Sequence, residues 1–225
     1  MEHRTAIVTG GSRGLGLALV RTLAAAGWHV VTDGRDPVTL SASAGAIPGV
    51  LAIPGDVTDA GHREALVAAA DGTIDLLVNN AGGLGPSPLP TLADYPLDAL
   101  AELFAVNVVA PIGLIQAALP QLAAGAAVVD ITSDAAVDAY PGWGGYGATK
   151  AALDHAGRVL AAERPDLRVL TIDPGDMRTQ MHQDAFPGED ISDRPPPEDS
   201  VPAILALVEG DQPSGRYRAS EVVAA

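Results

Sequence analysis

TAIVTGGSRGLGLALV, residues 5–20, joins an apolar run, a glycine-rich turn and the start of an Ala/Leu-rich stretch. The run 5–9 favours a strand, and 14–26 has the apolar spacing of a helix. Glycines between a strand and a helix let the backbone approach a pyrophosphate, and the helix N-terminus offers free N–H groups. The order therefore predicts a nucleotide-binding turn, with a plain tight turn as the alternative.

The same alternation continues along the chain. Short Val- and Ile-rich runs predict strands at 5–9, 29–33, 50–53, 74–79, 126–132, 167–172 and 216–219. Longer Ala/Leu-rich runs predict helices at 14–26, 59–70, 97–121, 146–163 and 199–208. Right-handed crossovers at each step give an α/β fold, a single-domain Rossmann-type doubly wound parallel sheet of about seven strands. We expect residues 1–225 to form one dinucleotide-binding and catalytic domain.

The composition excludes several classes of site and partner. Hydrophobic residues make up 48% of the chain but aromatic residues only 4%, so the core is built from Ala, Val, Leu and Ile. The chain has no cysteine, which excludes disulfides and thiolate chemistry, and its five histidines lack metal-ligand spacing, so we expect no metal. A net charge of -15 repels phosphate backbones, so we expect no nucleic-acid partner.

Two further expectations concern location and loops. The start MEHRTAIVTG does not resemble a secretory signal, and we expect no apolar run to be long enough to span a bilayer, so we expect a cytoplasmic protein with no membrane contact. The segments 82–96 and 184–199 break the βα rhythm. They are either surface loops or walls of a cleft, and in the second case the stretch near 180–199 is a lid over the substrate.

The glycine spacing T-G-x-x-x-G-x-G, from Thr9 to Gly16, resembles that of the short-chain dehydrogenase/reductase family. Further stretches resemble family motifs in the same order: DVTD at 56–59, DLLVNNAG at 75–82, AVN at 105–107, VDITSD at 129–134, YGATK at 146–150 and IDPGDMRT at 172–179. The resemblance covers about four fifths of the chain. It implies a nicotinamide dinucleotide as the cofactor.

The resemblance also implies which residues bind that cofactor. They are Gly10, Ser12, Arg13, Gly14, Leu15, Gly16, Arg35, Asp56, Val57, Asn80, Ala81, Gly82, Tyr146, Lys150, Pro174, Gly175 and Thr179. Thr179 is expected to meet the nicotinamide carboxamide, and the alternative is an N-cap of a following helix.

A tyrosine and a lysine four residues apart share one face of a helix. Tyr146 precedes Lys150 by that interval and follows Ser133 by thirteen residues, the interval that the family uses. Reduction of a ketone needs a proton donor near neutral pH, and we expect the charge of Lys150 to lower the pKa of the phenol. By resemblance, Lys150 also binds the ribose hydroxyls, Ser133 bonds the substrate oxygen and Asn107 positions a water. Tyr140 is either a wall of the substrate pocket or a loop aromatic.

The form of the cofactor depends on the end of the second strand. An acidic side chain there accepts from the ribose 2′-hydroxyl, whereas an arginine accommodates a 2′-phosphate. The acidic position of the family falls on Gly34, and Arg35 follows it, with Arg13 as a second cation. The sequence therefore favours NADP(H). The alternative is NAD(H), with Asp33 on the ribose and Arg35 packed on adenine.

Three aspartates depart from the family pattern, the first being Asp130, where asparagine is frequent and surface solvation is the simple reading. Asp134 stands where a second serine or small residue is common, and Asp176 where an apolar residue is usual. Either they are solvated surface residues, or they select a polar or cationic substrate.

The sequence thus predicts an NAD(P)-dependent oxidoreductase that acts on a small-molecule carbonyl or secondary alcohol. The alternatives are an epimerase or lyase on the same fold and a non-catalytic dinucleotide-sensing protein. We also expect a homodimer or homotetramer built on the helices at 97–121 and 146–163.

Overall fold

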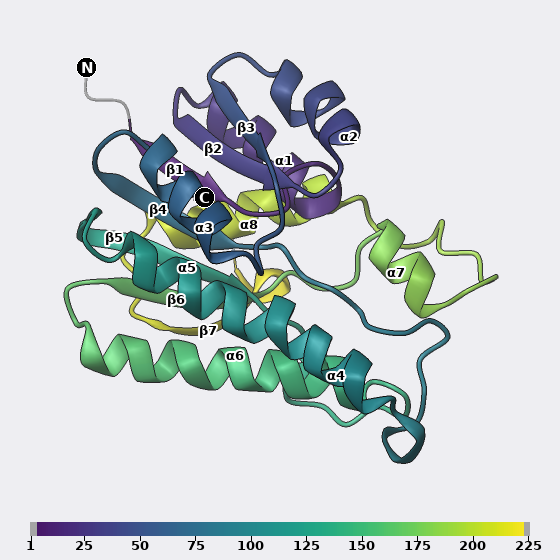
Figure 1. The fold of residues 1–225 in the computed structure, drawn as a ribbon. Helices are drawn as coiled ribbons and strands as arrows, with labels where there is room; N and C mark the ends of the chain where they lie inside the picture. The colour runs from purple at the N-terminus through teal and green to yellow at the C-terminus, as the bar shows by residue number, and fades with distance from the viewer. Residues whose placement is uncertain (1–3, 223–225) are drawn as a thin grey trace.

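The computed structural model describes residues 4–222 (Figure 1). One sheet of seven parallel strands has the order β3-β2-β1-β4-β5-β6-β7. The strands are β1 Thr5–Val8, β2 His29–Gly34, β3 Val50–Pro54, β4 Ile74–Asn79, β5 Leu122–Ile131, β6 Arg168–Asp173 and β7 Gly215–Arg218. All seven predicted strands and the Rossmann-type fold class are confirmed, although β5 begins earlier than predicted.

Residues 4–222 contain eight α-helices, which connect the strands. They are α1 Gly14–Ala25, α2 Pro37–Ala42, α3 Ala60–Ala69, α4 Leu97–Phe104, α5 Ala110–Ala118, α6 Gly144–Glu163, α7 Gln180–Ala185 and α8 Val201–Glu209. Each predicted helix is present, but 97–121 is two helices joined by a π-helical turn, Ala105–Val109. The helices α2 and α7 were not predicted, because six residues are too few to show a helical period.

The core lies in two layers, one on each face of the sheet. Ala6 and Val8 of β1 pack into the layer with α1 and α8, whereas Ile7 packs into the layer with α3 and α5. Neighbouring side chains of a strand point to opposite faces, so a strand buried on both sides is apolar throughout. Figure 1 shows α4, α5 and α6 together on one side of the sheet.

The site is placed by the strand order. The chain moves from β1 outward to β2 and β3, and then returns to the other side of β1 with β4. Ligands of such sheets bind in the crevice beyond the carboxyl ends of the strands at this reversal. The glycine turn after β1 and the NNAG segment after β4 both lie there.

The helical stretch Leu97–Ala118 corrects one sequence expectation. It has 22 residues and is long and apolar enough to cross a membrane by length and composition, with 33% of its apolar window buried. The expectation that no apolar run reaches this length is therefore wrong. In the fold, α5 of this stretch packs on α3 and α4 packs on α6, so the stretch is a covering layer of the sheet.

Candidate functional site

The turn after β1 leaves a recess that only glycine permits. Gly10 and Gly14 have φ of 72° and 57°, in the left-handed region. A Cβ on Gly16 would lie 2.3 Å from the carbonyl oxygen of Gly10 and 2.4 Å from Nδ2 of Asn80. At the N-terminus of α1, the N-cap residue Arg13 makes no side-chain capping bond. Backbone N–H groups at such an end suit a pyrophosphate.

The NNAG segment is tied to the end of β1. The Thr9 hydroxyl oxygen accepts from the backbone N–H groups of Asn80 and Ala81, both at 3.0 Å. The Asn80 amide donates to the Thr9 carbonyl oxygen at 2.8 Å. These bonds place the predicted cofactor residues Asn80, Ala81 and Gly82 beside the glycine turn.

The turn after β3 forms the predicted adenine end of the site. The Asp56 carboxylate accepts from the backbone N–H and the hydroxyl of Thr58 at 2.9 and 2.8 Å. The hydrogen bond from the Thr58 backbone lowers the pKa of Asp56, and the charges of Arg35 and His62 act in the same direction. Val57 is buried. The turn is therefore rigid, and Arg35 lies near it.

Asp33 and His62 make a contact that we did not predict. Asp33 is buried, and its Oδ1 accepts from the backbone N–H of Gly10 at 2.6 Å. Its Oδ2 lies 3.0 Å from Nε2 of His62 on α3. Both carboxylate oxygens of Asp33 are thus bonded within the protein. No local pattern signals this, because Asp33 and His62 are 29 residues apart.

Asn107 brings the catalytic elements together. Its side chain accepts from the Gly83 backbone N–H at 2.7 Å and donates to the Gly83 carbonyl at 2.9 Å and to the Thr149 hydroxyl at 3.0 Å. A Cβ on Gly82 would lie 3.2 Å from Oδ1 of Asn107 and 3.7 Å from Nζ of Lys150. The NNAG segment, the π-helical turn and α6 therefore meet at one point.

Tyr146 and Lys150 lie on one face of α6, as predicted. The ammonium of Lys150 is 5.6 Å from the Tyr146 ring centre and donates to the carbonyl oxygen of Ile131 at 2.8 Å. Burial raises the pKa of Tyr146 well above its usual value, and the negative charges of Asp173 and Asp134 act in the same direction. The expected lowering by Lys150 is therefore not achieved by the protein alone, because the cost of burying a phenolate is larger.

Further buried charges lie behind this pair. Burial lowers the pKa of Lys150 to about 8, while the carboxylates of Asp130 and Asp154 raise it. Asp130 on β5 has no exposed surface, and its Oδ1 accepts from the Asn79 amide at 2.8 Å. Burial raises the pKa of Asp130 to about 6, and the bond from Asn79 and the charge of Lys150 lower it only in part. The charges of Lys150 and Asp130 thus support each other in the core.

The side chain of Ser133 is hydrogen-bonded to its own neighbours in the chain. The Ser133 hydroxyl donates to Oδ1 of Asp134 at 2.9 Å, and its oxygen accepts from the backbone N–H of Ala135 at 3.2 Å. The hydroxyl of Tyr140, a residue 44% exposed, donates to Oδ2 of Asp134 at 3.0 Å. Asp134 is therefore half-buried and bonded to the predicted site residue Ser133.

The segment after β6 lies across the glycine turn. Gly175 has φ of 79°, next to Pro174. The Thr179 hydroxyl accepts from the His182 backbone N–H at 3.3 Å and caps α7, as in the alternative reading. A Cβ on Gly14 would lie 3.6 Å from the Thr179 methyl group. Thr179 is thus beside the recess, and its bond to a carboxamide stays a prediction.

The stretch 180–199 contacts the catalytic helix. The Phe186 ring lies 6.0 Å from that of Trp143, which is 5.7 Å from the Tyr146 ring. Asp176 is exposed and lies 3.6 Å from Arg194 of this stretch. Asp134 and Asp176 thus have different partners.

Arg216 is a second residue that we did not predict. From β7 its guanidinium donates to the Ser133 carbonyl at 2.9 Å, to Asp154 at 3.0 Å and to Asp173 at 3.4 Å. It therefore holds the backbone of Ser133 from the far side of β6. Ser133 and Arg216 are 83 residues apart, so no local spacing could show the contact.

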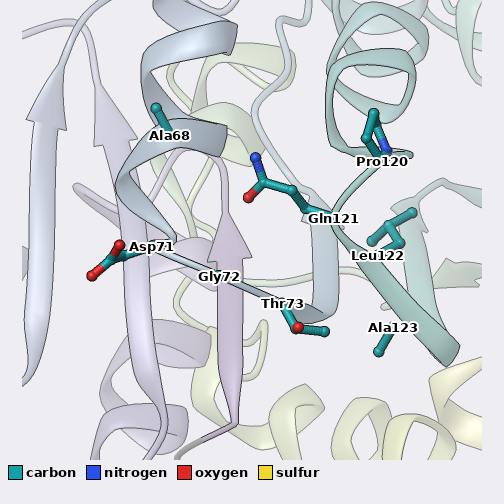
Figure 2. A pocket seen from close by; sticks show the side chains of 8 residues that line it. All are labelled: Ala68, Asp71, Gly72, Thr73, Pro120, Gln121, Leu122 and Ala123. Atoms are coloured by element: carbon teal, nitrogen blue, oxygen red, sulfur yellow. The ribbon is translucent and has the colours of Figure 1, made fainter.

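A shallow depression lies at the opposite end of the sheet, where β4 and β5 begin (Figure 2). It is lined by Ala68, Asp71, Gly72, Thr73, Pro120, Gln121, Leu122 and Ala123. Asp71 is its one titratable side chain, so it lacks the donors and charges of the crevice beyond the carboxyl ends. Within residues 4–222, no group of three or more His, Asp and Glu side chains is placed to bind a metal.

Comparison with known proteins shows the family to which the chain belongs. The family profile described as short chain dehydrogenase matches residues 4–190. Short chain dehydrogenase penD of Penicillium thymicola is 38% identical over 175 residues, which cover 72% of this chain and 63% of that protein. The chain therefore spans less than two thirds of that relative.

Two solved structures are similar over nearly the whole chain. A short-chain dehydrogenase from Streptomyces avermitilis has a TM-score of 0.84 and 28% identity, covering 97% of this chain and 88% of that one. A chain from Escherichia coli CFT073 in complex with NADPH has a TM-score of 0.86 and 29% identity, covering 97% of each chain.

Proposed function

Because the chain belongs to the short-chain dehydrogenase/reductase family of oxidoreductases, we propose that it transfers hydride between a nicotinamide dinucleotide and a small carbonyl compound or secondary alcohol. Tyr146 is the acid/base of this reaction. The observation that carries the proposal is the meeting of Gly82, Asn107 and Lys150 within a few ångströms, at the end of the glycine turn.

The residues present fit such a cofactor. Side chains on Gly10, Gly16 or Gly82 would collide with or crowd neighbouring protein atoms, so glycine is needed for the glycine turn and the NNAG segment to approach each other this closely. The N-terminus of α1 suits the pyrophosphate, and Lys150 suits the ribose hydroxyls. When bound, the nicotinamide exchanges the hydride, and its oxidised ring adds a positive charge to the site.

The protein groups then divide the proton chemistry. Tyr146 gives its phenolic proton to the carbonyl oxygen during reduction and takes it back during oxidation. Lys150 stays protonated at neutral pH and favours the phenolate, while Ser133 bonds the reacting oxygen. Asn107, fixed by three bonds, holds the end of the proton path to water.

The test is to follow nicotinamide absorbance with NADPH or NADP+ and a panel of ketones and secondary alcohols. We expect turnover with at least one pair. No change with any of them would favour an epimerase or lyase, or a protein that binds the dinucleotide without turnover. The presence of Tyr146, Lys150 and Ser133 together argues for turnover.

We propose NADP(H) over NAD(H). Asp33 uses both carboxylate oxygens within the protein, which argues against its bonding the ribose. Gly34 brings no carboxylate, and Arg13 and Arg35 are exposed cations at this end. Two guanidinium groups can bind a phosphate through paired hydrogen bonds. The similar Escherichia coli chain that binds NADPH supports the same choice.

Replacement of Arg35 tests this preference. Arg35→Ala should raise the KM for NADPH roughly 10- to 100-fold, since a hydrogen bond to a charged group contributes about 1.5–3 kcal/mol. The KM for NADH should stay nearly constant. Arg21→Ala, which removes an exposed cation from α1, is the control for net charge and should change neither value. Wild-type preference for NADH, unchanged in Arg35→Ala, would contradict the proposal.

We also propose a homodimer or homotetramer that covers the exposed faces of α4, α5 and α6. Val109 is 60% exposed and Val159 42% exposed, and the stretch Leu97–Ala118 is apolar with only a third of its apolar window buried. Exposed apolar surface of this extent is typical of a protein interface. A second copy that brings the same helices would bury it by two-fold symmetry.

Light scattering at micromolar concentration tests the assembly. The wild type should have at least twice the mass of one chain, and Val109→Glu should shift it toward the monomer, because a carboxylate would be buried without a partner. Val38→Glu adds the same charge at a 76% exposed site on α2 and should leave the mass unchanged. A monomeric wild type would rule out the interface.

A further inference from the structure

Asp134 takes the hydrogen that Ser133 needs for a substrate. A serine hydroxyl has one hydrogen and can donate to one acceptor at a time. That hydrogen is bonded to Oδ1 of Asp134 at 2.9 Å. A carbonyl oxygen has no hydrogen of its own, so it gains a bond from Ser133 only after the bond to Asp134 is released.

Releasing that bond is costly unless another donor replaces it. The three donors to Asp134 are the Ser133 hydroxyl, the Ala135 backbone N–H and the Tyr140 hydroxyl, all of them neutral. No ion pair formed by residues 4–222 includes Asp134. Its carboxylate is therefore held by hydrogen bonds from neutral groups rather than by an ion pair. Loss of a bond to a charged group is more costly than loss of a neutral one.

The position of Oδ1 limits what the new donor can be. Oδ1 lies one hydrogen-bond length from Oγ of Ser133, and Asp134 is only half-buried, so a substrate can reach it. If Ser133 bonds the reacting oxygen, a hydroxyl on the next carbon of the substrate falls beside Oδ1. Such a hydroxyl takes the place of the serine hydroxyl at the same acceptor.

We infer that Asp134 is a specificity-determining residue that selects α-hydroxy ketones, and in the reverse direction 1,2-diols. This inference rests on the proposed function. The substrate hydroxyl donates to Asp134, and the Ser133 hydrogen turns to the reacting oxygen, where negative charge develops in the transition state. A ketone without the hydroxyl has to compete with Asp134 for that hydrogen.

The test compares α-hydroxyacetophenone with α-methoxyacetophenone, which has a similar polarity but no donor, and with acetophenone. NADPH oxidation is measured with the wild type, Asp134→Asn and Asp134→Ala. We expect the wild type to prefer the hydroxy ketone over the methoxy ketone about tenfold or more in kcat/KM, the value of one hydrogen bond to a charged group. In Asp134→Ala the ratio should fall close to one, because the hydroxy ketone loses its acceptor and the methoxy ketone gains the Ser133 hydrogen.

The ratio of kcat/KM for the hydroxy ketone to kcat/KM for the methoxy ketone is taken within each variant. A misfolded fraction lowers both values equally, so it does not change the ratio. Asp134→Asn keeps the size and one acceptor oxygen without the charge, and its ratio should lie between the other two. A wild-type ratio near one, or a ratio that Asp134→Ala does not change, overturns the inference and leaves the proposed function standing. If none of the three ketones oxidises NADPH while other ketones do, the inference alone is wrong. No turnover with any carbonyl compound overturns the function as well.

Discussion

Tyr146→Phe is expected to lose most turnover while cofactor affinity stays nearly intact. The phenolic hydroxyl is the proposed proton donor, and removal of a general acid costs about 10²- to 10⁴-fold in rate. The ring itself remains, and its edge-to-face contact with Trp143, with centres 5.7 Å apart, is kept. The measurement is kcat from nicotinamide absorbance, together with a fluorescence titration of cofactor binding.

Two variants sharpen this test. Tyr217→Phe removes a hydroxyl that bonds the Pro213 carbonyl on the surface and should keep normal turnover. Lys150→Ala should reduce both turnover and cofactor affinity, because Lys150 is proposed to favour the phenolate and to bind the ribose. Near-normal turnover in Tyr146→Phe would show that another group supplies the proton.

Asp130→Asn is expected to remove a pH-dependent loss of stability. Burial raises the pKa of Asp130 from 3.8 to about 6, so the folded protein favours the neutral acid. The contribution of Asp130 to the free energy of unfolding is fully present below pH 3.8, and it is lost as the pH rises through about 6. The shift of about two units corresponds to roughly 3 kcal/mol in the free energy of unfolding. The asparagine has no charge to bury and can still accept from Asn79.

Urea unfolding of both proteins at several pH values between 4 and 7 measures this effect. The stability of Asp130→Asn relative to the wild type should increase across this range and stay constant above it. The Asp130 charge also stabilises the protonated form of Lys150. Asp130→Asn removes that charge, and any resulting cost of keeping Lys150 protonated reduces the increase in the free energy of unfolding at neutral pH. A difference between the two proteins that does not depend on pH would show that Asp130 titrates normally.

The sequence predicts best those elements that have a strong local pattern. The inner strands, such as β1 and β4, are mostly apolar because both faces of the sheet are covered there, and the glycine turn shows itself by spacing alone. The stretch 97–121 was predicted as one helix, but its π-helical turn contains Asn107, whose side chain bonds the backbone of Gly83. That partner belongs to another segment, so helical spacing could not reveal the break.

The sequence by itself determined the order of the βα units, the recess at Gly10, Gly14 and Gly16, and the common face of Tyr146 and Lys150. Each of these depends on backbone geometry within a few residues, so it can be read from spacing.

Only the tertiary structure decided the partners and the protonation of the site. It bonded Asp33 to His62, Ser133 to Arg216, and it raised the pKa of Tyr146 where the sequence predicted a lower one. The physical reason is that hydrogen-bond partners and the cost of burying a charge depend on segments far apart in the chain. Those segments come together only when the sheet forms.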